Sequence, residues 1–82
     1  MRTRRYTFTV LIEPGEDRGY VVTCPALPGL VTEGRNLKEA RVMAGEAILG
    51  YLEALRKARL PIPRDKDIEA VKEKVTVALA AV

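Results

Sequence analysis

The chain has 82 residues, which is room for one domain that buries only about 60% of its unfolded surface. Hydrophobic residues make up 48% of the chain and its formal net charge is +3, a composition that excludes a disordered tail. Because so short a chain has only a modest core, we expect self-association to add to its stability. The single cysteine excludes an internal disulfide, and no apolar run approaches the roughly 20 residues of a membrane-spanning helix, so we expect a cytoplasmic protein.

The charge is unevenly distributed along the sequence. Residues 1–12 carry a formal charge of +3, residues 13–34 carry −3, residues 35–59 carry +3, and the remainder is balanced. Ordinary solvated charge explains such a pattern, and the alternative is an acidic surface that meets a basic partner.

Three strands are predicted first. Aromatic and β-branched residues alternate with other residues over 6–13 and over 19–24, and this period of two is typical of half-buried strands. The apolar side of these strands carries Tyr6, Phe8, Val10, Ile12, Tyr20, Val22 and Cys24. The short polar turn between them predicts an antiparallel hairpin. Pro25 ends the second strand, and the turn at Pro28-Gly29 leads into a short third strand over 30–34.

A long helix is predicted over residues 37–58. Asn36 suits the N-cap position, and Glu39 follows three residues later, as in a capping box. One apolar stripe at helical spacing comprises Leu37, Ala40, Ala44, Ala47, Ile48, Tyr51, Leu55 and Ala58. Gly45 and Gly50 each weaken a helix by roughly 1 kcal/mol relative to Ala, so we expect tight packing at both. Pro61 ends the helix.

The C-terminal part has two interpretations. Residues 65–72 fit a short helix, and β-branched residues alternate over 75–79, which predicts a fourth strand. A helix from 67 to the end is the alternative, because alanine favours helices. With the strand, the order is β-β-β-α-β: an α+β fold in which an antiparallel three-stranded meander has a long helix on one face and the fourth strand joins the sheet.

The residue types that are missing limit the chemistry. Without Ser or His, hydrolase triads are excluded, and one Cys without His cannot build a tetrahedral zinc site. We interpret Cys24 as a small apolar side chain within a strand. The glycines fit neither phosphate-binding nor dinucleotide-binding spacing, so no cofactor is expected. Many arginines with a single Asn indicate a thermophilic source or a GC-rich genome.

Two other activities are weaker alternatives. Carboxylates such as Glu13 and Glu33 at strand ends are the remaining route to metal-dependent catalysis, although solvated strand ends explain them equally well. The arginines at 2, 4 and 5 suit contact with phosphates, yet no nucleic-acid-binding motif follows them. We therefore expect that this chain is not an enzyme and does not bind nucleic acid directly.

Residues 5–63 resemble the HicB-like antitoxin family. The resemblance rests on Tyr6-Thr7-Phe8-Thr9-Val10-Leu11-Ile12-Glu13, Gly19-Tyr20-Val21-Val22, Pro25-Ala26-Leu27-Pro28-Gly29, Thr32-Glu33-Gly34, Leu37-Lys38-Glu39-Ala40, Glu46-Ala47-Ile48, Tyr51-Leu52-Glu53-Ala54-Leu55 and Pro61-Ile62-Pro63. It implies a single antitoxin domain over 1–82, with a core over about 5–80 and a partial RNase H-like fold. It also implies a homo-oligomeric antitoxin of a type II toxin–antitoxin pair, which covers the active site of a HicA-like, mRNA-cleaving toxin.

This sequence departs from the family pattern in three respects. Leu30 stands where members often carry Cys, and the net charge is positive although the toxin is basic. The chain ends without the C-terminal DNA-binding domain that many members append, so we expect no promoter recognition of its own. We expect the toxin to contact the hairpin and the P-x-L-P-G loop through Glu16, Asp17, Tyr20, Leu27, Pro28 and Glu33. The alternatives are an orphan oligomeric binding module and a degenerate RNase H-type nuclease.

Overall fold

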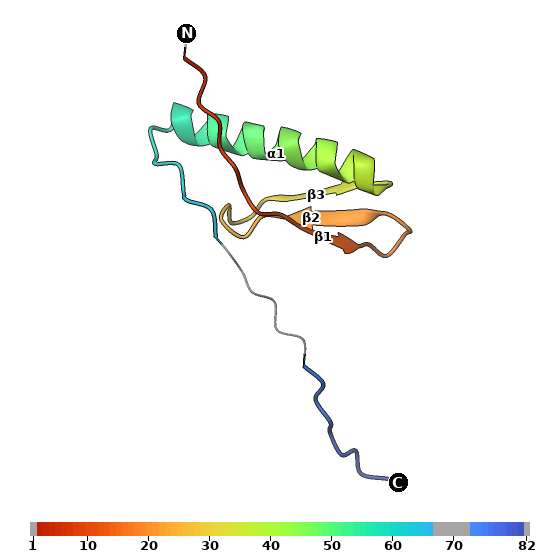
Figure 1. Cartoon of the computed structure of the whole chain (residues 1–82). Helices are drawn as coiled ribbons and strands as arrows, with labels where there is room; N and C mark the ends of the chain where they lie inside the picture. The colour runs from red at the N-terminus through yellow and green to blue at the C-terminus, as the bar shows by residue number, and fades with distance from the viewer. Residues whose placement is uncertain (1, 67–72, 82) are drawn as a thin grey trace.

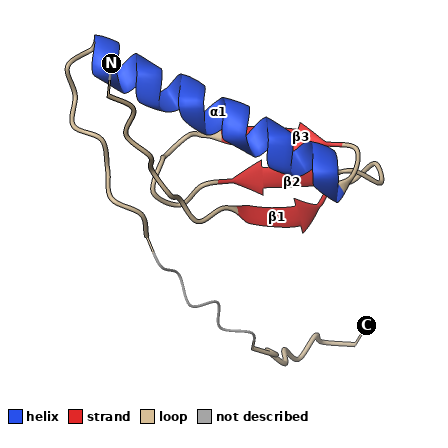
Figure 2. Ribbon diagram, turned by 45° about the horizontal axis from the view of Figure 1, so that its top comes forward, coloured by secondary structure: helices blue, strands red, loops and turns tan. Residues whose placement is uncertain are grey.

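The computed structural model describes residues 2–66 and 73–81, in which three strands are followed by one helix. Strands β1 (Leu11–Pro14), β2 (Tyr20–Thr23) and β3 (Val31–Gly34) form an antiparallel sheet in that order. Helix α1 (Leu37–Lys57) crosses one face of the sheet (Figures 1 and 2). The predicted α+β arrangement of a three-stranded meander with a long helix on one face is confirmed.

The two faces of the sheet differ as the alternation predicts. Ile12, Val22 and Thr32 lie opposite one another across the three strands, and Val22 packs against Ala40 and Ala44 of α1. Even-numbered strand residues therefore face the helix, and odd-numbered residues point to the uncovered face.

Strand β1 is shorter than the predicted 6–13. If the β1–β2 register continued beyond Leu11↔Thr23, Thr9 would lie opposite Pro25. Proline has no N–H to donate to a ladder, so pairing ends here. The Thr9 N–H donates instead to Oδ1 of Asp65, at 2.7 Å.

Two buried clusters form the core beneath α1. One joins Val22 to Ala40 and Ala44, and the other joins Cys24, Leu27 and Leu30 to the C-terminal half of the helix. Cys24 is a buried free thiol, as predicted. Of the aromatic residues expected in the core, Phe8 and Tyr20 are half-buried against it, whereas Tyr6 is exposed.

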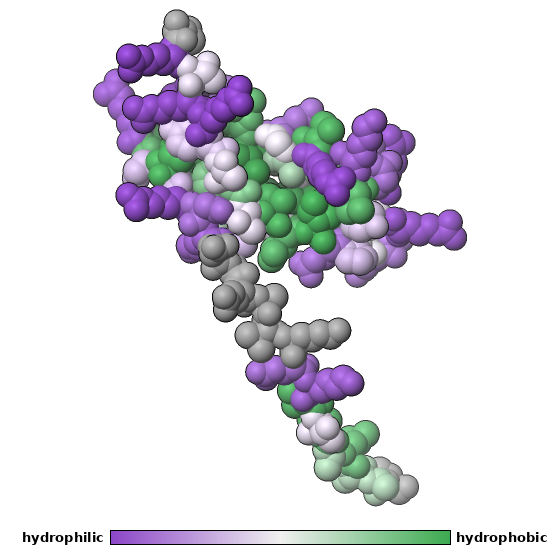
Figure 3. All heavy atoms as spheres, in the orientation of Figure 1, coloured by the Kyte–Doolittle hydropathy of each residue, from purple (hydrophilic) through white to green (hydrophobic). Residues whose placement is uncertain are grey.

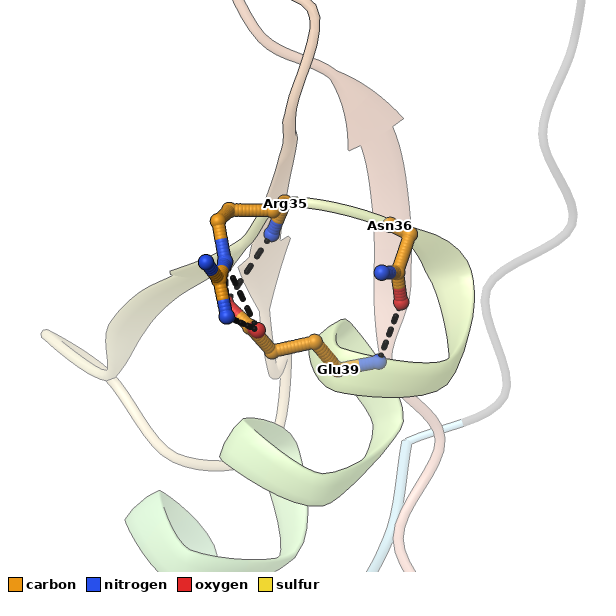
Figure 4. Close-up of polar contacts among 3 residues, drawn as sticks. All are labelled: Arg35, Asn36 and Glu39. Carbon is orange, nitrogen blue, oxygen red and sulfur yellow. Dashed lines mark hydrogen bonds and ion pairs between the residues drawn. The ribbon is translucent and has the colours of Figure 1, made fainter.

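Both ends of α1 are capped. The Asn36 side chain accepts a 2.8 Å hydrogen bond from the Glu39 N–H, which confirms the predicted N-cap (Figure 4). The Glu39 carboxylate accepts a hydrogen bond from the Arg35 N–H, whereas a capping box would use the N–H of the N-cap residue, Asn36. At the C-terminus Arg59 has a φ of 58°, and the Leu60 N–H donates to the Leu55 carbonyl at 2.9 Å, which is a Schellman motif.

The expectation of tight packing at Gly45 and Gly50 is wrong. Both are exposed, and a Cβ added to either would meet nothing within 4 Å. The close approach lies at Gly34, where a Cβ would come within 2.7 Å of the Ala40 Cα. Gly34 is buried because β3 ends directly against the first turn of α1.

The predicted fourth strand is not formed within this chain. Residues 73–81 have no strand or helix assignment, and Val75, Val77 and Leu79 are 81%, 81% and 94% exposed. The segment extends away from the sheet, so no strand edge lies beside it to pair with (Figures 1 and 2). Residues 65 and 66 of the predicted short helix are not helical, and 67–72 lie outside the described residues. The alternative C-terminal helix is likewise absent from 73–81.

Candidate partner-binding surface

The β1–β2 hairpin presents two carboxylates at its tip. The Gly15 N–H donates to the Gly19 carbonyl at 2.7 Å, which closes a three-residue loop of Glu16, Asp17 and Arg18. Arg18 has a φ of 62°, the left-handed position that ends such a loop. All three loop side chains are exposed.

Four of the sequence-predicted contact residues border one depression. Glu16, Asp17, Tyr20 and Glu33 all line an open hollow of about 1050 Å³ between the hairpin, the end of β3 and the first turns of α1. One wall of the hollow is formed by residues 14 to 21. The rest of its lining includes Gly34, Arg35, Glu39 and Met43. The antiparallel pairing of Tyr20 with Gly34 brings these segments together.

The charge of this hollow is acidic once its internal ion pair is considered. Arg35 binds Glu39 through its guanidinium, with a closest distance of 2.8 Å. The hydrogen bonds from Arg35 hold the pKa of Glu39 below its usual value, and those to Glu39 raise the pKa of Arg35. Within residues 2–66 and 73–81, no ion pair involves Glu16, Asp17 or Glu33. Their charges remain available to a partner, with Arg18 as the nearby exposed base.

The other two predicted contact residues lie at the opposite end of β2. Leu27 is fully buried and anchors the P-x-L-P-G loop in the core. Pro28 is exposed, but its carbonyl accepts the Tyr51 hydroxyl at 2.8 Å. Gly29 has a φ of 85° and the Leu30 N–H donates to the Leu27 carbonyl, so this loop is a type II turn. The structure thus separates this loop from the hairpin instead of joining them in one surface.

The uncovered sheet face is a feature that the sequence reasoning missed. Leu11, Val21 and Val31 lie on it, Val31 being 66% exposed, and Glu13 and Glu33 flank Val21 in the same cross-strand row. The odd-numbered positions of the strand alternation carry this signal, because they already held valines among polar residues. The face is apolar at its centre and acidic toward the hairpin.

Basic side chains gather at the other end of the molecule. The N-terminal segment passes the C-terminal end of α1 (Figures 1 and 2). Exposed basic residues of both segments are Arg2, Arg4, Arg5, Arg56, Lys57 and Arg59. The end opposite the hairpin is therefore basic. At the hairpin end the acidic side chains border the hollow, and Arg18, Lys38 and Arg41 are exposed nearby.

The described residues offer little for other classes of site. Glu13 and Glu33 are on strands separated by β2, so their backbones are roughly 10 Å apart. No group of three or more His, Cys, Asp or Glu side chains is placed to hold a metal ion within 2–66 and 73–81. Over the same ranges, no helix has both the length and the apolar character needed to cross a bilayer.

Comparison with known proteins assigns the family. The pattern of a family described as "HicB_like antitoxin of bacterial toxin-antitoxin system" matches residues 8–80. A UPF0150 protein of Thermoplasma acidophilum is 50% identical over 58 residues, which are 71% of this chain and 84% of that protein. A UPF0150 protein of Synechocystis is 38% identical over 60 residues, 73% of this chain and 76% of the relative. The chain therefore belongs to the HicB-like antitoxin family.

Proposed function

We propose that this chain is an antitoxin that binds a small, basic, mRNA-cleaving HicA-like toxin and neutralises it by direct contact, without catalysing a reaction itself. The observation that carries the proposal is the family match over residues 8–80. The absence of Ser and His from the sequence supports the non-catalytic part, because it excludes hydrolase triads of the Ser-His-Asp and Cys-His kinds.

The hairpin end of the molecule is the proposed contact surface. Glu16, Asp17 and Glu33 are exposed beside one hollow, and Tyr20 provides a half-buried aromatic wall. A basic toxin would be attracted to this end and repelled by the opposite, arginine-rich end. This polarity would orient the toxin before contact, which mainly raises the association rate. Leu27 is not part of the surface, because its side chain is fully buried.

The test begins with a search beside this gene for a small basic protein of the HicA-like type. The purified chain is added to that protein in an mRNA-cleavage assay, and the affinity is measured by calorimetry. We expect cleavage to stop at stoichiometric amounts of the chain. Absence of both binding and inhibition would overturn the antitoxin role and favour the orphan binding module. Cleavage of RNA by the chain alone with Mg²⁺ would favour the nuclease alternative.

A charge-matched pair of variants tests the surface. Asp17→Lys with Glu33→Lys changes the net charge by the same amount as Glu46→Lys with Glu53→Lys, and all four side chains are exposed. We expect the first variant to lose affinity by about tenfold or more, chiefly through slower association at low salt, and the second to change little. Equal losses in both variants would move the interface away from the hairpin end.

A further inference from the structure

The basic end of the molecule is built from two segments that are far apart in the sequence. Residues 2–9 and 54–60 together contain six basic side chains and no acidic one. All six are exposed: Arg2, Arg4, Arg5, Arg56, Lys57 and Arg59. Figure 3 shows hydrophilic side chains gathered around the N-terminal segment and the C-terminal end of α1. The fold therefore concentrates positive charge that the sequence divides between two regions.

Two contacts hold the N-terminal segment beside the end of the helix. The Phe8 side chain packs against the buried cluster beneath the C-terminal half of α1. Thr9 is bonded at 2.7 and 2.8 Å to Asp65, in the chain that follows the helix. Arg4 and Arg5 come four and three residues before Phe8, so even an extended chain keeps their backbones within about 14 Å of it. The basic residues of both segments therefore belong to one surface.

This surface has no counter-charge of its own. Over residues 2–66 and 73–81, none of the six basic side chains takes part in an ion pair or a side-chain hydrogen bond. Basic residues in a last helical turn often serve the free carbonyl groups there. In α1 the carbonyls of Ala54, Leu55 and Arg56 already accept N–H groups from residues 58–60. The exposed charges are thus available to an anionic ligand.

The residue types at this end suit phosphate groups and unpaired bases. Five of the six basic residues are arginines, whose planar guanidinium binds a phosphate through two hydrogen bonds and also stacks on aromatic rings. Tyr6 directly follows Arg5 and is 46% exposed. Within the described ranges the Tyr6 hydroxyl makes no side-chain hydrogen bond. Exposed aromatic rings beside basic residues are typical of surfaces on which the bases of a single strand stack.

The arrangement favours a single strand over a DNA duplex. A protein that reads a duplex places the side of a helix or a two-stranded β-ribbon in a groove. Here the basic residues lie around the last turn of α1 and in a segment without helix or strand assignment. The faces of the bases in a duplex are covered by their neighbours, so only an unpaired base offers Tyr6 a face to stack on.

We propose that the basic end of this chain binds a single-stranded nucleic acid, with the six basic residues on its phosphates and Tyr6 stacked on an unpaired base. The arginines at 2, 4 and 5 alone did not predict such binding, and the fold adds the basic residues of α1 to them. The 21 residues of α1 span about 30 Å between this end and the hairpin hollow. A strand bound here would therefore leave the proposed toxin surface uncovered.

A charge-matched pair of variants tests the surface. Fluorescence anisotropy of the full chain measures binding to labelled oligouridylate and oligothymidylate of about 15 nucleotides. Arg5→Glu with Arg56→Glu changes one residue of each segment, and Lys38→Glu with Arg41→Glu changes the net charge equally near the start of α1. We expect the first variant to lose about tenfold or more in affinity and the second much less. The logarithm of the wild-type binding constant should fall with the logarithm of the salt concentration at a slope between about −2 and −4, as three to six phosphate contacts predict.

Two substitutions of Tyr6 test the stacking. Tyr6→Ala removes the ring, and Tyr6→Phe keeps it. We expect Tyr6→Ala to weaken binding to the single strands by about fivefold or more, while Tyr6→Phe binds as the wild type does. A DNA duplex with the same number of phosphates should bind more weakly and be insensitive to Tyr6→Ala. Tyr6 lies outside every helix and strand, so the circular dichroism spectrum should not change in either variant.

The two oligonucleotides also identify the kind of strand. Tighter binding of the oligouridylate would assign RNA as the ligand, tighter binding of the oligothymidylate would assign single-stranded DNA, and equal binding would assign the chemistry that they share. Absence of binding at low salt would overturn the proposal, as would equal losses in the two double variants. A duplex bound as tightly as the single strands, with no effect of Tyr6→Ala, would overturn it as well. These measurements use no toxin, so their outcome is independent of the antitoxin assay.

Discussion

Asp65 accepts two hydrogen bonds from Thr9, 56 residues earlier in the sequence. Oδ1 accepts the Thr9 backbone N–H at 2.7 Å, and Oδ2 accepts the Thr9 hydroxyl at 2.8 Å. The β1–β2 pairing ends before Thr9, so the Thr9 N–H does not bond to β2 and donates to Asp65 instead. It ties the chain after α1 to the chain before β1.

This contact predicts a dependence of stability on pH. The Thr9 backbone bond, followed by the hydroxyl bond, holds the pKa of Asp65 below its ordinary value. A carboxyl with a lowered folded-state pKa stabilises the fold above its unfolded pKa, and this contribution is lost as the pH falls through the folded pKa. Urea unfolding over the acidic range should therefore show a shallower decline for Asp65→Asn than for the wild type. Some decline should remain, because the pKa of Glu39 is also lowered.

The control for this measurement is Glu53→Gln, on the exposed side of α1. Its stability profile should follow that of the wild type. If Asp65→Asn followed it too, the bonds to Thr9 would not contribute to stability in solution.

Two glycine substitutions should change stability in opposite directions. An Ala Cβ at Gly34 would come within 2.7 Å of the Ala40 Cα and 2.9 Å of the Glu39 carbonyl carbon. Because backbone atoms cannot move aside cheaply, Gly34→Ala should destabilise the fold by about 1–3 kcal/mol. Gly45→Ala adds a methyl group to open space in a helix and should stabilise by up to about 1 kcal/mol. Thermal and urea unfolding measure both changes, and a destabilising Gly45→Ala would indicate that a partner packs on that face.

The C-terminal cap of α1 contains a residue that glycine would improve. Arg59 occupies the left-handed region, which costs a non-glycine residue about 1–2 kcal/mol. Replacing Arg59 by glycine removes this cost, but glycine also has more conformational freedom in the unfolded chain, which offsets part of the gain in stability. Arg59→Gly should therefore stabilise the fold by about 0.5–1 kcal/mol. Arg56→Gly, inside the last turn, should instead destabilise by about 1 kcal/mol. The same sign for both variants in urea unfolding would contradict the assigned cap.

The hydrogen bond between Tyr51 and Pro28 fastens the helix to the loop after β2. Tyr51→Phe removes the hydroxyl while keeping the ring against the buried Cys24–Leu27–Leu30 cluster, so the loss should be about 1 kcal/mol. Tyr20→Phe is the control, because within the described ranges the Tyr20 hydroxyl makes no side-chain hydrogen bond. Equal losses in thermal unfolding would show that the bond to Pro28 adds nothing.

The local features of this protein were determined by the sequence alone. The alternation over Tyr20 to Cys24 placed Val22 toward the helix, and Asn36 with Glu39 marked the start of α1, because these signals depend only on residues a few positions apart. The family was also recognisable from short motifs, and the acidic character of residues 13–34 identified the hairpin as a candidate surface.

Contacts between distant residues were decided only by the tertiary structure. The β2–β3 register places Glu33 and Tyr20 beside the acidic hollow, whereas Leu27 is buried and does not reach the surface. Both placements depend on how β3 and α1 pack on β2. The segment 75–79 shows the same limit. Its alternation predicts which side chains a paired strand would bury. Whether it pairs depends on an edge being within reach, and period-two spacing contains no information about which edge that is.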